Sequence, residues 1–207
     1  MEIIQMSGTK LYNIYKTIPY IDEGTMGVLK KYDENTLIKF YFVQHADHLL
    51  VLDYMCDDVT DILLYMTKSS NRKDIERVKK LMERQPIIKQ TTLPTGIIIT
   101  NKFLCASLIP YFKEYRTLLN LQSNLSNKDK IKVLEVVREK VKELTDNYIY
   151  PNDLWAKNIM IHPITKDIEL IDLDDRKTFV RDSCDKDSNI KAEKAFDELV
   201  MALKKND

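Results

Sequence analysis

Residues 150–175 read YPNDLWAKNIMIHPITKDIELIDLDD, and this stretch decides the fold that the sequence predicts. Asp153 and Asn158 precede a short apolar run, IMI, and a second apolar run, IELI, leads directly into Asp172. Two strands joined by a turn at residues 162–167 would bring the loop before the first strand close to the end of the second. We therefore expect Asp153, Asn158 and Asp172 to converge from opposite ends of one β-hairpin.

The three converging side chains would form a hard, oxygen-only ligand set. Two carboxylates and an amide oxygen suit Mg²⁺ beside phosphate. Asp174 and Asp175 follow closely, and either could share the metal. The alternative is that these acids are turn residues flanking solvated strands, as Asn and Asp commonly are. The apolar runs favour the metal site, because carboxylates at the ends of buried strands need partners or a cation.

Two segments of this stretch resemble the catalytic motifs of protein kinases. Residues 153–158, DLWAKN, resemble the catalytic loop, in which Asn stands five residues after the Asp of H-R-D. Residues 171–174, IDLD, resemble the strand that ends in the metal-binding Asp of D-F-G. Pro151-Asn152 replace the His-Arg pair, and Leu173-Asp174 replace Phe-Gly. The acidic ending is also reminiscent of the small-molecule phosphotransferases of the same superfamily.

The resemblance implies a role for each matching residue. Asp153 would accept the proton of the substrate hydroxyl. Asn158 and Asp172, with Asp174, would hold Mg²⁺. Lys157 would contact the transferred phosphate.

The composition favours a soluble globular protein of one or two small lobes. The chain has 207 residues, of which 44% are hydrophobic and 31% are charged. It carries 32 basic and 32 acidic side chains, so its charge indicates neither nucleic acid nor an anionic membrane as partner. No apolar run approaches the roughly 18 residues of a membrane span, and the N-terminus lacks a signal-peptide pattern. Three isolated cysteines indicate reduced thiols, so we expect a cytoplasmic protein, in its producer or in a host.

A glycine turn lies between the first two of three strands predicted from LYNIYKTIPYI, GVLKKY and TLIKFYFV. A turn whose backbone approaches a phosphate closely needs glycine, although GTMG alone is an ordinary hairpin turn. The segment resembles the kinase glycine-rich loop, with Asp22 in place of its first glycine. By this resemblance Gly24, Thr25 and Gly27 would cover the phosphates of ATP.

The third strand contains LIKF, which resembles the V-A-I-K strand that supplies the phosphate-binding lysine of kinases, here Lys39. A helix from about residue 72, ended by Pro86, follows later in the chain. In kinases a glutamate of this helix pairs with the lysine, which implies an ion pair between Glu76 and Lys39, with Asp74 and Glu83 as alternatives. Glu76 could equally contact Lys80 on a solvated helix face.

The remaining elements follow the same order as in a kinase. Residues 44–70 predict one or two amphipathic helices, an insertion, and strands are predicted from IIKQTTL, GIIIT and FLCASLIPYF. The last of these strands would place Ile109 at the back of an adenine pocket. Helices are predicted at residues 129–147 and 190–205, and the polar segment after Asp175 is predicted to be irregular.

The sequence therefore predicts an α+β, protein-kinase-like two-lobe fold. Residues 1–112 would form an N-terminal antiparallel sheet with a regulatory helix, and residues 113–207 a reduced helical lobe. The 32 residues after Asp175 contain no A-P-E motif and leave no room for an activation segment together with several more helices. We therefore expect a reduced C-terminal lobe without a standard activation segment, which resembles that of small bacterial effector-type or atypical kinases.

The expected function is an ATP- and Mg²⁺-dependent phosphotransferase acting on a hydroxyl, expected to be Ser or Thr of a protein. Its expected partner is a protein substrate or an activating protein, and the oligomeric state stays open. The alternatives are a pseudokinase-like binding module and a small-molecule kinase.

Overall fold

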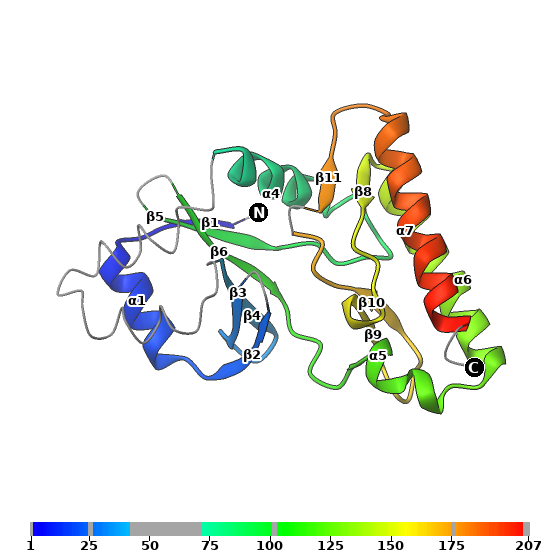
Figure 1. The fold of residues 1–207 in the computed structure, drawn as a ribbon. Helices are drawn as coiled ribbons and strands as arrows, with labels where there is room; N and C mark the ends of the chain where they lie inside the picture. The colour runs from blue at the N-terminus through cyan, green and yellow to red at the C-terminus, as the bar shows by residue number, and fades with distance from the viewer. Residues whose placement is uncertain (1, 25–26, 42–71, 101–102, 175–176, 205–207) are drawn as a thin grey trace. The chain divides into compact units, whose positions relative to one another are not determined.

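A computed structural model describes residues 2–24, 27–41, 72–100, 103–174 and 177–204 (Figure 1). The chain forms two compact units. Unit 1 comprises Met1–Glu83 and Pro94–Tyr111, and unit 2 comprises Arg84–Leu93 and Phe112–Asp207. The predicted helical insertion at residues 44–70 lies outside the described residues.

Unit 1 is built on a six-stranded sheet with the order β1-β5-β6-β4-β3-β2. Strands β2 to β6 pair antiparallel, as predicted, and β1 adds a parallel strand beside β5. The strands are β1 (Glu2–Gln5), β2 (Tyr20–Gly24), β3 (Gly27–Lys31), β4 (Thr36–Tyr41), β5 (Gly96–Thr100) and β6 (Phe103–Pro110).

Helix α1 (Gly8–Thr17) occupies a segment for which the sequence analysis predicted a strand, and that prediction is wrong. The Ser7 hydroxyl caps the helix by accepting a hydrogen bond from the Lys10 amide at 3.3 Å. Apolar residues of the helix and its C-cap recur at helical spacing and pack with Ile38, Phe40 and Ile98 of the sheet; they are Leu11, Ile14, Tyr15 and the C-cap residue Ile18. The alternation within LYNIY concealed this stripe, because short apolar runs fit both periods.

Helix α4 (Arg72–Arg84) covers the other face of the sheet, as its predicted apolar stripe requires. Ile75, Val78 and Met82 pack against Ile97 and Leu104. Ile97 and its chain neighbour Ile98 belong to the two different clusters, and successive strand residues point to opposite faces. The sheet is therefore buried on both faces, between α1 and α4 (Figure 1).

Unit 2 combines two long helices, α6 (Asn127–Asp146) and α7 (Lys186–Lys204), with two small sheets. The first sheet has the order β10-β9-β7, and the second pairs β11 with β8 antiparallel. The other elements of unit 2 are β7 (Arg116–Thr117), α5 (Leu118–Leu121), η1 (Gln122–Asn124), β8 (Ile149–Pro151), η2 (Ala156–Asn158), β9 (Ile159–Ile161), β10 (Ile168–Leu170) and β11 (Thr178–Val180).

Two further predictions fail in unit 2. Residues 87–93, IIKQTTL, form no strand, because Glu143 of α6 binds their backbone instead. Its carboxylate accepts hydrogen bonds from the amides of Lys89, at 2.8 Å, and Gln90, at 2.9 Å. The segment after Asp175, predicted to be irregular, contains β11, whose Thr178 and Val180 are buried.

None of the helices in the described part of the chain has the length and apolar character needed to cross a membrane.

Candidate functional site

The predicted hairpin in unit 2 is confirmed. Strands β9 and β10 pair antiparallel, with Ile161 opposite Ile168 and Ile159 opposite Leu170, and all four side chains are buried. The turn closes with the amide of His162 donating to the carbonyl of Asp167 at 2.8 Å.

The pairing extends past β10 and brings the two predicted motifs together. The Ile171 amide donates to the backbone carbonyl of Asn158 at 2.9 Å. The backbone of Asn158 therefore lies beside the residue that precedes Asp172. Asp172 itself has a positive φ of 64°.

Asp172 stands between the end of β10 and the turn residues Leu173 and Asp174, at neither a helix end nor a hairpin loop of the described chain. The other non-glycine residues with positive φ in the described chain are Tyr148, which follows the end of α6, and Lys166, in the β9–β10 turn. Such left-handed residues are common at helix ends and hairpin turns. At other places they are uncommon and cluster at functional sites. This backbone conformation supports a functional role for Asp172.

Asp153 and Asn158 are in direct contact. The buried Asn158 amide nitrogen donates to the Asp153 carbonyl at 2.9 Å and to its Oδ2 at 3.3 Å. Two backbone hydrogen bonds close the loop between them. The Trp155 amide donates to the Asp153 carbonyl at 3.1 Å, and the Asn158 backbone amide donates to the Trp155 carbonyl at 2.8 Å. Because the Asn158 amide nitrogen is bound to Asp153, the amide oxygen is the atom that Asn158 would offer to a metal.

Asp174 lies deeper than the other acids, with 2% of its surface exposed. A carboxylate at this depth needs hydrogen bonds or a cation. No group of three or more His, Cys, Asp and Glu side chains gathers as a metal site within the described residues. The Asn158–Asp172 pair still fits Mg²⁺, which usually binds one or two carboxylates and completes its shell with water and substrate phosphates.

A lysine that the sequence analysis missed contacts the candidate base. Lys177 Nζ lies 2.9 Å from Asp153 Oδ1; the Asp153 side chain is 11% exposed and that of Lys177 is 56% exposed. Lys157, which was predicted to contact the phosphate, is exposed at the short helix η2. Lys177 belongs to no recognisable motif, and only the pairing of β11 with β8 brings it to Asp153.

In unit 1, Lys39 lies on the face of the sheet that α4 covers. Its neighbours Ile38 and Phe40 belong to the cluster under α1, so Lys39 and Tyr41 point to the opposite face. The buried Lys39 ammonium lies 5.6 Å from the centroid of the Tyr41 ring, and Tyr41 packs against the α4 cluster.

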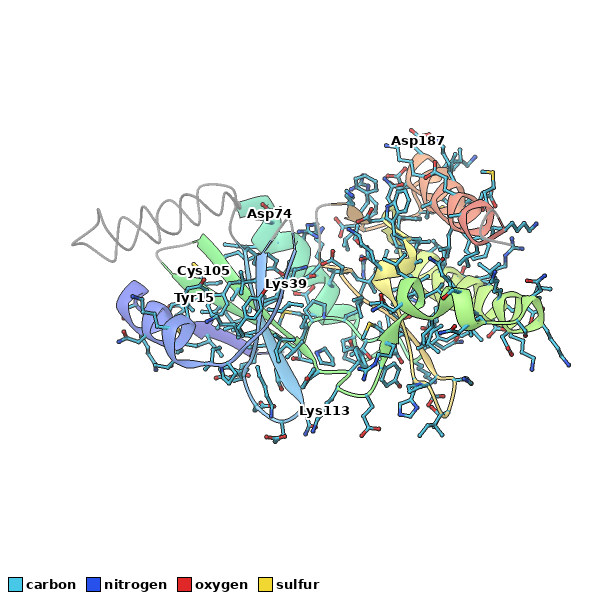
Figure 2. All side chains as sticks on the ribbon, turned by 60° about the horizontal axis from the view of Figure 1, so that its bottom comes forward. Tyr15, Lys39, Asp74, Cys105, Lys113 and Asp187 are labelled. Carbon is cyan, nitrogen blue, oxygen red and sulfur yellow. The ribbon has the colours of Figure 1, made fainter. Side chains whose placement is uncertain are left out.

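The two acids near the start of α4 differ in orientation. Glu76, the predicted partner of Lys39, is exposed. Asp74 lies one turn before the buried Val78, so the two share a helix face, and its side chain is 13% exposed. Arg77 Nη2 lies 3.7 Å from Asp74 Oδ1. Glu83, the other alternative acid, is exposed. Position and burial therefore favour Asp74 as the partner of Lys39; Figure 2 labels both residues.

The predicted phosphate-loop glycines end β2 and begin β3. Gly24 and Gly27 are register partners, and Thr25 lies outside the described residues. Ile109, predicted to face adenine, pairs with Leu37 in the centre of the sheet.

Comparison with known proteins finds a likeness in structure and none in sequence. No protein-family model matches the chain, and no curated protein matches it. Among solved structures it resembles the Cydia pomonella granulovirus kinase PK-1, with a TM-score of 0.51 and 13% sequence identity. The match covers 84% of this chain and 58% of the viral kinase.

The fold is protein-kinase-like. An N-terminal sheet with one helix packed on the expected face precedes a mainly helical unit with the β9–β10 hairpin. This kinase-like fold differs from the predicted one by the added elements β1 and α1, which extend the sheet and cover its second face.

Proposed function

We propose that this protein is an ATP- and Mg²⁺-dependent phosphotransferase that acts on a hydroxyl group, Ser or Thr of a protein. One observation carries the proposal. The Asn158 side chain binds Asp153, while its backbone carbonyl accepts a hydrogen bond from the residue before Asp172. Asn158, itself a candidate metal ligand, thereby contacts the candidate general base with its side chain and the residue before the second candidate ligand with its backbone.

The proposed roles follow from the chemistry of each group. Asn158 and Asp172 hold Mg²⁺, which when bound neutralises charge on the phosphates of ATP. Asp153 takes the proton of the acceptor hydroxyl, a task that needs an ionised carboxylate within hydrogen-bond reach. Lys39 contacts the phosphates, and Asp74 orients it. Gly24 and Gly27 line the nucleotide with their backbone, Ile109 contacts adenine, and Asp174 supports the metal site.

The choice of a protein acceptor rests on the size of the helical unit. Small-molecule kinases enclose their acceptor in a larger helical lobe, whereas unit 2 contains two long helices within the described residues. A small-molecule acceptor is the first alternative.

A pseudokinase-like binding module is the second alternative, and one feature favours it. Asp22, on β2, stands where the glycine-rich loop of kinases has its first glycine. A carboxylate near a triphosphate would weaken nucleotide binding by charge repulsion.

Thermal unfolding with ATP, with and without Mg²⁺, tests the proposal. A ligand at about 100 times its Kd stabilises a protein by roughly 2.7 kcal/mol, or roughly 5–10 °C for a chain of this size. We expect a Mg²⁺-dependent shift of this size in the wild type, its loss in Asp172→Ala, and its retention in Asp197→Ala, an exposed aspartate of α7. An unshifted wild type would contradict the proposal.

A further inference from the structure

The ion pair between Lys177 and Asp153 gives the candidate base a cation that belongs to neither predicted motif. We propose that Lys177 is a catalytic residue of the phosphoryl transfer. Its ammonium pairs with Asp153 before the reaction, and it pairs with the transferred phosphoryl group once Asp153 has taken the hydroxyl proton. This inference rests on the proposed function.

The position of Lys177 is fixed by strand pairing. Lys177 immediately precedes Thr178, which opposes Pro151 in the β11–β8 pair. Asp153 stands two residues after Pro151. The buried Thr178 side chain anchors this end of β11, so the backbone of Lys177 is held beside the chain that leads into Asp153.

The described contacts leave the Asp153 carboxylate able to accept a further hydrogen bond. Lys177 Nζ binds Oδ1 of Asp153 at 2.9 Å, whereas the Asn158 amide binds Oδ2 at 3.3 Å. A carboxylate offers about four lone-pair sites, so two contacts do not saturate it. The Lys177 side chain is more than half exposed, which lets its ammonium turn toward a phosphate without leaving a buried position.

The changes in charge during phosphoryl transfer favour movement of the Lys177 ammonium from Asp153 to the phosphoryl group. The acceptor oxygen forms a bond to the γ-phosphorus, and the bond from that phosphorus to the bridging oxygen breaks, its electron pair leaving with ADP. The hydroxyl proton passes to Asp153, which becomes neutral and no longer attracts Lys177. The ammonium keeps all its protons, and its charge then stabilises the anionic phosphoryl oxygens.

Lys177 is better placed to contact the transferred phosphate than Lys157, the lysine for which the sequence predicted this contact. Among the described side chains, the ammonium in contact with Asp153 is that of Lys177, whereas Lys157 is exposed on η2.

A transition-state analogue tests the inference without turnover. Trp155 is the chain's single tryptophan and lies two residues from Asp153, so intrinsic fluorescence reports on this loop. We would titrate the full chain with ADP and with ADP–aluminium fluoride, both with Mg²⁺, and measure ATP hydrolysis in parallel. The variants are Lys177→Met and Lys177→Arg, with Lys194→Met as the control for loss of an exposed ion pair, that of Lys194 with Glu198.

A group that acts only in the transition state should discriminate between the two ligands. We expect Lys177→Met to weaken the binding of ADP–aluminium fluoride by roughly 10- to 100-fold and that of ADP by less than about threefold. The kcat for hydrolysis should fall in parallel at an unchanged KM for ATP. Lys177→Arg should recover part of both losses, and Lys194→Met should match the wild type.

Three results would overturn the inference. Equal weakening of both ligands would show ordinary binding or a structural role, and unchanged or faster hydrolysis by Lys177→Met would show a dispensable or inhibitory contact. In both cases the wild-type activity, and with it the proposed function, would stand. A wild type that binds neither ligand would instead refute the proposed function together with the inference.

Discussion

Replacing Asn158 with alanine separates the two roles that the structure gives this residue, as a loop tie and as a metal ligand. In Asn158→Ala the Asp153 carbonyl loses a hydrogen bond of 2.9 Å, and its carboxylate loses one of 3.3 Å. The carbonyl keeps the hydrogen bond from the Trp155 amide and the carboxylate keeps its contact with Lys177, so neither acceptor is left without a donor. Two lost hydrogen bonds, at a net contribution of about 1 kcal/mol each, give an expected loss of about 2 kcal/mol in the free energy of unfolding.

Thermal unfolding without nucleotide should therefore show a decrease in Tm of roughly 4–8 °C, at about 2–4 °C per kcal/mol for this chain length. Addition of ATP with Mg²⁺ should then fail to raise the Tm of the variant, whereas the wild type gains roughly 5–10 °C.

The matched control is Asn189→Ala, which removes an exposed side-chain contact with Glu193 on α7 and should leave both measurements within about 1 °C of the wild type. A variant that is destabilised and still shows the full Mg²⁺-dependent shift would refute Asn158 as a metal ligand. An unchanged Tm without nucleotide would refute the contact between Asn158 and Asp153 itself.

The remaining predictions concern the helix α4, the segment anchored by α6, and acid stability. Asp74→Asn should weaken ATP binding in isothermal titration by at least about tenfold, because Asp74 shares the buried face of α4, whereas Glu76→Gln should leave binding unchanged. A larger loss of binding in Glu76→Gln than in Asp74→Asn would restore Glu76 as the partner of Lys39. Glu143→Gln replaces one of two carboxylate oxygens that accept backbone amides, so urea denaturation should show a loss of about 1.5–3 kcal/mol, and no loss would contradict this anchor. Hydrogen bonds from Arg181 and Ser188 hold the pKa of Asp185 well below its usual range. The ionised carboxylate therefore stabilises the fold at pH values above the carboxyl pKa of the unfolded chain, and this contribution is lost as the pH falls below about 4. Asp185→Asn should therefore flatten the decrease in the urea midpoint between about pH 5 and pH 2, and an unchanged slope would exclude this carboxyl as its source.

The sequence predicted those parts of the fold whose signal is local. The β9–β10 hairpin was predictable because two short apolar runs flank a turn, and α4, α6 and α7 because their apolar residues recur at helical spacing. Helix α1 was missed although Leu11, Ile14, Tyr15 and Ile18 have helical spacing, because its aromatic residues and partial alternation also fit a strand.

Residues 87–93 show where local reasoning fails. IIKQTTL has the β-branched composition of a strand, yet the amides of Lys89 and Gln90 bind Glu143, which is more than 50 residues away in the sequence. Two of the backbone amides that a strand would have given to a neighbour are bound by one carboxylate of α6. A long-range contact of this kind produces no periodic pattern of apolar residues in the sequence of the segment that it holds in place.

In the candidate site, too, residues placed by local sequence could be predicted, whereas a residue placed by a long-range contact could not. Asp153, Asn158 and Asp172 could be predicted together because the spacing in one hairpin determines where their backbones meet. Lys177 could not, because its contact with Asp153 depends on the register of β11 against β8, two strands of three residues each in otherwise polar sequence. A shift of that register by one residue would turn Thr178 out of the core and carry Lys177 away from Asp153. The burial of Thr178 and Val180 therefore does more than complete a small sheet, because it sets which cation faces the proposed base.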